Sequence, residues 1–174
     1  MWRTLILLAV AAKALAPGDP LPPIRGELLS GKTAELPAAA RGHVALLALG
    51  FAHASNHAVE AWTKRFRQEF GRDPDVTAYQ IPVVGGMGKL GKPFMMRGMR
   101  KDTPKADYDH FLVVFNDAGE WKQRVNFKAP NDAYLILIDA HGIVRWLGSG
   151  SPDEHQYSEL REAAKKLRLQ NQSN

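Results

Sequence analysis

The sequence predicts an α/β fold in which helices flank a mixed sheet, and three observations support that prediction. Residues 43–51 (HVALLALGF) are an almost continuous apolar run, typical of a strand buried on both faces. Residues 59–70 repeat large apolar side chains at spacings of three and four, typical of an amphipathic helix. Residues 133–139 (AYLILID) and 143–147 (IVRWL) flank a short glycine-containing turn, as the strands of a hairpin do. A buried strand followed by a helix and, later, a hairpin gives a mixed sheet with helices on its faces.

The middle of the chain is less regular. Residues 76–84 (VTAYQIPVV) predict a second strand, which ends at a glycine pair, and residues 93–100 predict a short helix. The apolar run in residues 107–116 (DYDHFLVVFN) fits either a helix or a strand, because short runs do not distinguish the two. Residues 121–127 (WKQRVNF) alternate as an exposed strand does.

The C-terminal segment predicts a helix that starts at Ser151. Ser151 and Glu154 have the spacing of a capping box, and Pro152 suits the first helical position. A helical apolar stripe follows at Tyr157, Leu160, Ala164 and Leu167.

Composition limits the class of protein. The chain has 174 residues, of which 45% are hydrophobic and 24% charged, which suits one globular domain and excludes a disordered or collagen-like chain. Twenty-three basic against 18 acidic residues give a net charge of +5, too scattered along the sequence to predict a nucleic-acid partner. The chain has no cysteine, which excludes disulfides, thiolate nucleophiles, cysteine-ligated zinc and iron–sulfur clusters.

The N-terminus predicts a secretory signal peptide over residues 1–16, followed by a single domain over residues 17–170. A positive start at Arg3 precedes an apolar run, and Ala14-Leu15-Ala16 is a small-x-small cleavage site. The apolar run is too short to span a bilayer. We therefore expect a secreted or periplasmic protein; an uncleaved anchor, an N-terminal helix and a mitochondrial presequence are the alternatives.

The order of elements, with Gly50-Phe51 before a loop and helix and the late hairpin LILIDAHGIVRW, resembles the thioredoxin fold. GFAH at residues 50–53 is similar to the start of the GFTHCPxxCP pattern of Sco-type copper chaperones, a family related to the peroxiredoxins. The two cysteine positions of that pattern fall on Ala54 and Ala58, and the cis-proline of the redox families would fall near Ala133. The resemblance therefore implies a thioredoxin-like domain without the groups that a disulfide reductase or peroxidase needs.

A second resemblance covers residues 20–168. The mitochondrial ATP synthase assembly-factor family, the tenth ATPase-complex assembly factor, ends with an Asn, a YxxLxD strand, a basic residue with Trp, a glycine-containing turn and a helix. The corresponding residues here are Asn131, Tyr134–Asp139, Arg145-Trp146 and Gly148–Gly150. The family has Gly where this chain has Ala133, and residues 85–130 match poorly. The resemblance implies an assembly or chaperone factor for a membrane complex, and the secretory presequence implies a bacterial relative.

His53 and His57 are four residues apart, where redox members of the fold carry their cysteines. Two imidazoles on one helical face can share a copper or zinc ion, and the candidate third ligands are His110, His141 and His155. Two neutral ligands alone bind weakly, so a capping loop with two exposed histidines is the competing interpretation. We predict no other metal or cofactor.

Met95, Met96 and Met99 lie within five residues and are flanked by basic residues. Thioethers suit copper(I), but clustered methionines more often form an adaptable apolar contact surface. We predict that this stretch faces a protein partner or a membrane; the alternative is a solvated loop with one or two buried methionines. Arg145 and Trp146 are the second candidate interaction surface.

Together these features predict a non-catalytic, extracytoplasmic thioredoxin-fold protein that acts by binding a protein partner, as an assembly or chaperone factor for a membrane complex. Peripheral membrane contact is compatible with that role, and no nucleic-acid partner is expected. The first alternative is a copper- or zinc-binding protein that uses His53 and His57. The second is a thioredoxin- or peroxiredoxin-type oxidoreductase, which the absence of cysteine disfavours, because a fold does not carry a function whose reacting atoms are missing.

Overall fold

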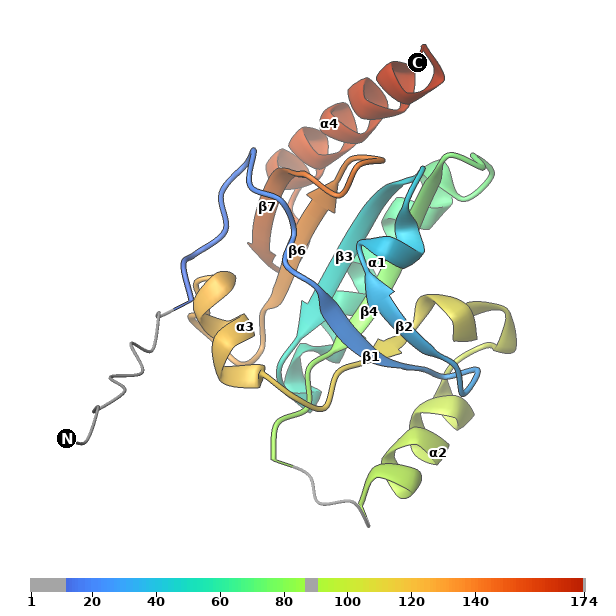
Figure 1. Ribbon diagram of the computed structural model, residues 1–174, viewed down its shortest axis with the longest axis vertical. Helices are drawn as coiled ribbons and strands as arrows, with labels where there is room; N and C mark the ends of the chain where they lie inside the picture. The colour runs from blue at the N-terminus through green and yellow to red at the C-terminus, as the bar shows by residue number, and fades with distance from the viewer. Residues whose placement is uncertain (1–11, 87–90, 174) are drawn as a thin grey trace, which may run out of the picture.

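The computed structural model describes residues 12–86 and 91–173 (Figure 1). The strands are β1 (Ile24–Leu28), β2 (Thr33–Leu36), β3 (Val44–Gly50), β4 (Val76–Pro82), β5 (Leu112–Val113), β6 (Ala133–Ile138) and β7 (Val144–Gly150). The α-helices are α1 (Asn56–Phe70), α2 (Lys92–Asp102), α3 (Ala118–Arg124) and α4 (Glu154–Gln172). Short 3-10 turns are η1 (Ala38–Ala40), η2 (His53–Ser55) and η3 (Lys105–His110). In this part of the chain, none of the helices has the length and apolarity needed to span a bilayer.

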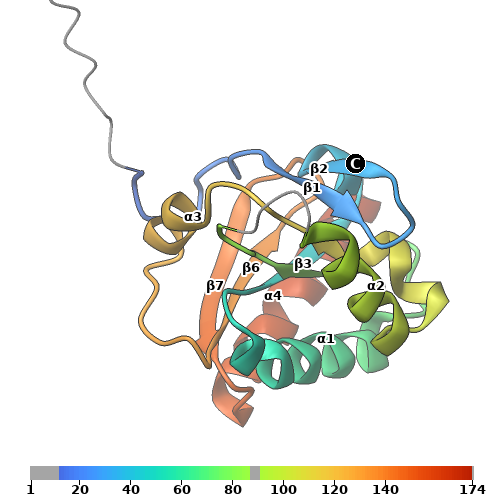
Figure 2. The same cartoon turned by 90° about the horizontal axis from the view of Figure 1, so that it is seen from below.

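The main sheet has the strand order β4-β3-β6-β7. Strands β3 and β4 are parallel, whereas β6 pairs antiparallel with both β3 and β7. Helices α1 and α4 cover one face of this sheet, and the N-terminal strands and α3 lie over the other (Figure 2). The predicted α/β fold with a mixed sheet flanked by helices is confirmed.

Burial on both faces explains the continuous apolar sequences of β3 and β6. Side chains alternate between faces along a strand, so Leu47 and Ile136 enter the cluster under β1 and β2. Their neighbours Leu46 and Leu135 enter the cluster under α1 and α4. Every residue of both strands is buried, as the near-continuous apolar runs predicted.

A second, smaller sheet has the antiparallel order β2-β1-β5, and the sequence interpretation did not include it. Its short strands are half exposed, so they lack the long apolar runs that identified β3 and β6. The stretch 107–116, which fitted either a helix or a strand, contains the end of η3 and then β5. Isolated parallel bridges from Phe111 to Gln80 and from Val114 to Val83 connect this stretch to the β4 edge of the main sheet.

The strand predicted for residues 121–127 is wrong, because residues 118–124 form helix α3. The alternation of apolar and polar residues coincides with a helical pair, in which Trp121 and Val125 are four residues apart and both contact the core. Asp117 and Asn126 have positive φ angles of 60° and 53°, so the chain turns sharply on both sides of the helix.

The capping box predicted at Ser151 is also wrong. Asp153 is the N-cap of α4, and its carboxylate accepts a hydrogen bond of 2.9 Å from the backbone N–H of Gln156. The side-chain amide of Gln156 also donates to this carboxylate at 2.8 Å, and the two hydrogen bonds lower the pKa of Asp153. The predicted helical stripe is confirmed, since Tyr157, Leu160, Ala164 and Leu167 are all buried.

Residues 1–11 of the predicted signal peptide lie outside the described residues, whereas residues 12–16 are described. Leu15 packs against the core, and its N–H donates to the carbonyl of Arg124 at 2.8 Å. Gly18 N–H donates to the carbonyl of Val144 at 2.7 Å, and Val144 N–H donates to the carbonyl of Asp19 at 2.9 Å, so the segment pairs with the first residue of β7. A cut after Ala16 would therefore remove a residue that contacts the folded core.

Candidate functional site

The first candidate site lies at the end of the main sheet where β3 leads into α1. His53 lies in η2 and His57 at the start of α1, and both side chains are exposed. Ala54 is exposed, whereas Ala58 is 5% exposed and packs against the core. The two positions that carry cysteines in the Sco-type pattern therefore hold two methyl groups, which supply neither a nucleophile nor a redox couple.

Ser55 fixes the turn between β3 and α1. Its side chain is fully buried, and its hydroxyl donates to the carbonyl of Ala52 at 2.7 Å. The turn also needs glycine at position 50, because a Cβ there would lie 2.5 Å from Ser55 Oγ and 3.2 Å from Val59 Cγ2. The Ser55 hydroxyl is thus used for structure, and the loop is held in one shape without a bridging disulfide.

An aromatic cluster packs beside this loop, in the core on the β1 and β2 face of the main sheet. The rings of Phe51, Phe127 and Tyr134 lie pairwise 5.4–5.6 Å apart, mostly edge to face. The Tyr134 hydroxyl accepts hydrogen bonds from the N–H groups of Lys128 and Ala129 at 2.7 and 2.9 Å, and it donates to the Ala129 carbonyl at 3.1 Å. The cluster therefore fixes the loop before β6, where the redox families carry their cis-proline. Sequence reasoning identified Phe51 and Tyr134 separately but did not bring Phe127 to them.

The structure does not add a third ligand to His53 and His57. Within residues 12–86 and 91–173, no group of three or more His, Cys, Asp or Glu side chains is arranged to hold a metal ion. The three candidate third ligands lie elsewhere. The ring of His110 lies 5.3 Å from that of Tyr79 at a tilt of 46°, His141 lies in the β6–β7 turn, and His155 lies in the first turn of α4.

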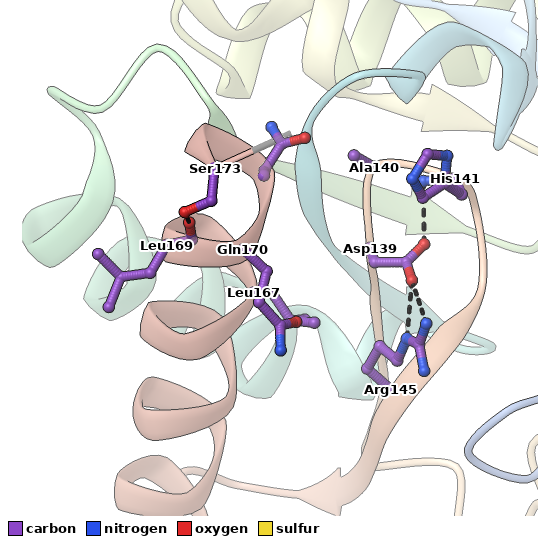
Figure 3. A pocket seen from close by; sticks show the side chains of 9 residues that line it. Asp139, Ala140, His141, Arg145, Leu167, Leu169, Gln170 and Ser173 are labelled. Carbon is purple, nitrogen blue, oxygen red and sulfur yellow. Dashed lines mark hydrogen bonds and ion pairs between the residues drawn. The ribbon is translucent and has the colours of Figure 1, made fainter.

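The second candidate site is at the opposite end of the sheet, in the turn between β6 and β7 (Figure 3). Asp139 Oδ1 accepts hydrogen bonds from the backbone N–H groups of His141 and Ile143 at 2.9 and 3.0 Å. Its other oxygen accepts a hydrogen bond of 2.7 Å from Arg145 Nε and forms an ion pair with Arg145 Nη2, also at 2.7 Å. One buried carboxylate therefore closes the turn and fixes the orientation of the guanidinium group.

Arg145 and Trp146 point into different surroundings, as adjacent residues of a strand do, and a bulge in β7 also places Val144 and Trp146 against opposite faces of the sheet. Leu137 pairs with Trp146 and Ile138 pairs with Val144, so Arg145 is the additional residue of the bulge. Trp146 is half-buried, and its ring centre lies 6.2 Å from that of Trp62 on α1. Arg145 is exposed and forms its ion pair with Asp139. The structure therefore separates the two side chains that the sequence placed in one interaction surface.

Hydrogen bonding lowers the pKa of Asp139. Burial by itself raises the pKa of this carboxyl group, but the hydrogen bonds from Ile143, Arg145 and His141 outweigh burial, and the net shift is downward. Asp139 is therefore charged over the ordinary pH range, and Arg145 keeps its partner.

Arg145 and Asp139 line one wall of a pocket of about 450 Å³. The other wall is the end of α4, which contributes Leu167, Leu169, Gln170, Asn171 and Ser173. Sequence reasoning did not include these α4 residues, because nothing in their local pattern distinguishes them from an ordinary helix end. The pocket combines an exposed cation with amide groups and two leucines, which suits binding of a polar segment.

The three methionines lie on α2. Met96 is 2% exposed and packs with Leu29 and Val113, so it belongs to a core cluster. Met99 is partly buried against the same cluster, and Met95 is half-buried. The large exposed apolar side chain of this helix is Phe94, which sequence reasoning did not single out.

The chain resembles thioredoxin-like solved structures at low sequence identity. A candidate thiol:disulfide interchange protein, DsbE, from Chlorobium tepidum has a TM-score of 0.59 at 16% identity, covering 89% of this chain and 99% of that one. BsSco, a member of the Sco family of cytochrome c oxidase assembly proteins, has a TM-score of 0.55 at 15% identity, covering 87% and 98%. The thiol peroxidase from Chromobacterium violaceum has a TM-score of 0.55 at 13% identity, covering 90% of each chain. These likenesses show a thioredoxin-like fold.

No curated protein sequence matches the chain. A family model does match: residues 13–167 fit the family described as ATP10 protein. This match covers most of the 174 residues and agrees with the resemblance drawn from Tyr134–Asp139 and Arg145-Trp146. The chain therefore belongs to the ATP10 family of ATP synthase assembly factors, and it has a thioredoxin-like fold without cysteine.

Proposed function

We propose that the protein acts by binding, as a non-catalytic extracytoplasmic factor in the assembly of a membrane complex. The observation that carries this proposal is the pair of alanines, Ala54 and Ala58, at the cysteine positions of a thioredoxin-like scaffold. Membership of an assembly-factor family supports it. A scaffold that keeps its shape without its reacting atoms retains only the ability to recognise a partner.

An extracytoplasmic location is supported by the predicted signal peptide, whose first eleven residues lie outside the described part of the chain. The partner that we propose is a protein subunit of the membrane complex. Two surfaces are available for it: the loop at His53 and Ala54, and the pocket beside Arg145.

Site-specific cross-linking in cells tests this proposal. A photoreactive amino acid is placed at Ala54 or at His141 of the tagged full-length chain, and membranes are solubilised for mass spectrometry. Lys64, exposed on the outer side of α1, is the matched control position. We expect a subunit of one membrane complex to be captured from Ala54 or His141 and not from Lys64. Capture of no membrane-complex subunit from either position would contradict the proposal.

The oxidoreductase alternative is tested by the reduction of insulin disulfides. The reaction requires a thiolate that attacks a disulfide sulfur, and the chain has no cysteine to supply it. We expect the purified protein to give the same rate as buffer. Turnover proportional to protein concentration would show that this exclusion is wrong.

A copper or zinc site at His53 and His57 is the second candidate function, because both imidazoles are exposed beside the start of α1. Calorimetric titration of the wild-type chain and of His53→Ala with copper or zinc separates the two candidates. Binding that is tight in the wild type and lost in His53→Ala would support a metal function. Equal, weak binding in both would remove it.

A further inference from the structure

Helix α2 is held against the body of the protein through one face. Met96 is 2% exposed and packs with Leu29 and Val113. Arg100 Nε donates to the carbonyl of Leu29 at 2.7 Å, and the Tyr108 hydroxyl donates to the carbonyl of Arg100 at 2.7 Å. These contacts fix the rotation of the helix, so the face that points to solvent is well defined.

The outward face carries an exposed aromatic ring beside basic side chains. Phe94 is 79% exposed, and Arg97, Gly98 and Lys101 are also exposed at spacings that place them on the same side of a helix. Gly98 lies one turn after Phe94, and an added Cβ there would meet nothing within 4 Å. No packing reason requires glycine at this position, and its lack of a side chain leaves the Phe94 ring uncovered.

The same segment carries most of the net charge of the protein. Residues 92–105 contain five basic residues and one acidic residue, a balance of +4 against +5 for the whole chain. Lys92 pairs with Glu27 at 2.7 Å. Across residues 12–86 and 91–173, Arg97, Lys101 and Lys105 form no ion pair. Their charges therefore face the solvent without neutralisation.

This combination fits a lipid surface better than a protein surface. Helix α2 projects from one end of the molecule (Figure 1), and its apolar contact is a single ring rather than a broad patch or a groove. A stable protein interface requires several packed anchors around a desolvated centre. A bilayer interface requires an apolar side chain at the level of the headgroups and cations opposite anionic lipids, and this helix supplies both.

We propose that α2 docks on the surface of an anionic phospholipid bilayer, with the Phe94 ring inserted among the headgroups and Arg97 and Lys101 opposite the lipid phosphates. This ligand is additional to the protein partner of the proposed function. Either interaction can fail without affecting the other.

Flotation of the full-length chain with vesicles tests the docking. Vesicles of phosphatidylcholine containing phosphatidylglycerol are compared with vesicles of phosphatidylcholine alone. Each cation near an anionic surface contributes about fivefold in binding, so we expect the loss of both in Arg97→Glu/Lys101→Glu to weaken binding about 25-fold or more. Phe94→Ser should weaken it about fivefold, through lost burial of the ring. All variants share the same N-terminal apolar segment, so the differences between them report on α2.

Two matched controls lie on other surfaces. Leu169→Ser removes a large apolar side chain that is 56% exposed on α4, the one besides Phe94 in the described part of the chain. Lys64→Glu/Lys166→Glu makes the same charge change at exposed positions of α1 and α4. We expect both controls to bind the anionic vesicles within about twofold of the wild type, since surface changes away from the contact have small effects.

The absence of cysteine allows a direct readout of depth. Gly98→Cys introduces a single thiol on the proposed contact face while Phe94 is kept, and Leu169→Cys is the control. An environment-sensitive fluorophore on residue 98 should shift to the blue on anionic vesicles, whereas the same label on residue 169 should not.

Equal losses in the α2 and control variants, or equal shifts at residues 98 and 169, would overturn the proposal. If the α2 variants keep vesicle binding but lose the cross-linked protein partner, the face binds protein, and the proposal is likewise overturned.

Discussion

At the end of the main sheet where β3 leads into α1, the exposed groups include two imidazoles and a methyl group, at His53, His57 and Ala54. At the opposite end, where β6 turns into β7, the carboxylate of Asp139 accepts three hydrogen bonds and forms an ion pair that fixes the guanidinium group of Arg145. The loop at the first end is fixed by buried contacts of Ser55 and of the ring of Phe51. The turn at the second end is fixed by a charged network. The difference shows that buried packing fixes one end of the sheet, whereas hydrogen bonds to a charged group fix the other.

Removing the charge at the second end should have the largest effect. Asp139→Ala leaves two backbone N–H groups and Arg145 without their acceptor, and we expect a loss of about 3 kcal/mol in the free energy of unfolding. Urea unfolding followed by tryptophan fluorescence measures it. His141→Ala, an exposed residue of the same turn, is the control and should change stability by less than about 0.5 kcal/mol. Equal effects would contradict the role of the carboxylate.

The same ion pair predicts a pH dependence. The pKa of Asp139 is lower in the folded protein than in the unfolded chain, so its contribution to stability is present above the unfolded-state value, about 4. That contribution is lost as the pH falls through the lower folded-state value. We expect the stability difference between wild type and Asp139→Ala to shrink on acidification below about pH 4. A difference that stays constant down to pH 2 would show that the charge is not responsible.

The next test disturbs the supporting structure at the first end. In Gly50→Ala the new methyl group would lie 2.5 Å from Ser55 Oγ, which is buried and already bonded to Ala52. We expect a loss of about 2 kcal/mol in thermal or urea unfolding experiments. Gly98→Ala is the control, because its methyl group meets nothing and removes an exposed helical glycine. It should stabilise the protein by about 0.5–1 kcal/mol, and a loss in both variants would contradict the steric explanation.

The aromatic cluster behind the first end predicts a smaller loss. Tyr134→Phe keeps the ring contacts with Phe51 and Phe127 but removes the hydroxyl that bonds Lys128 and Ala129. We expect a loss of about 1–1.5 kcal/mol and faster amide hydrogen exchange at residues 128 and 129. Unchanged exchange at those two amides would show that the hydroxyl does not hold the loop.

The exposed groups at the first end should matter least for folding. His53→Ala and His57→Ala remove solvated side chains, so each should change the free energy of unfolding by less than about 0.5 kcal/mol without added metal. A larger loss in either variant would show that the imidazole makes a structural contact. Comparison with Asp139→Ala then shows which end of the sheet contributes more to the free energy of unfolding, because both are measured in the same way.

Sequence reasoning worked where burial dominates the local pattern. Burial made four elements predictable. Strands β3 and β6 are buried at every residue, and helices α1 and α4 bury apolar side chains at helical spacing. It failed for α3, where seven residues are too few to separate a helical pair from an alternating strand. It also missed the β1–β2 pair, since half-exposed short strands carry little apolar signal.

The candidate sites divide in the same way. The absence of thiol chemistry follows from the sequence alone, because folding cannot supply a sulfur atom that the chain lacks. The burial of β3 and β6 on both faces follows as well, because side-chain periodicity is a local property. Only the tertiary structure decided that Val144 and Trp146 pack on opposite faces of the sheet, since a bulge in the pairing of β7 with β6 shifts the alternation at Arg145. Only the tertiary structure decided that Met96 is buried and Phe94 exposed, because the side of a short helix that faces inward depends on strands β1 and β5, which are distant in sequence.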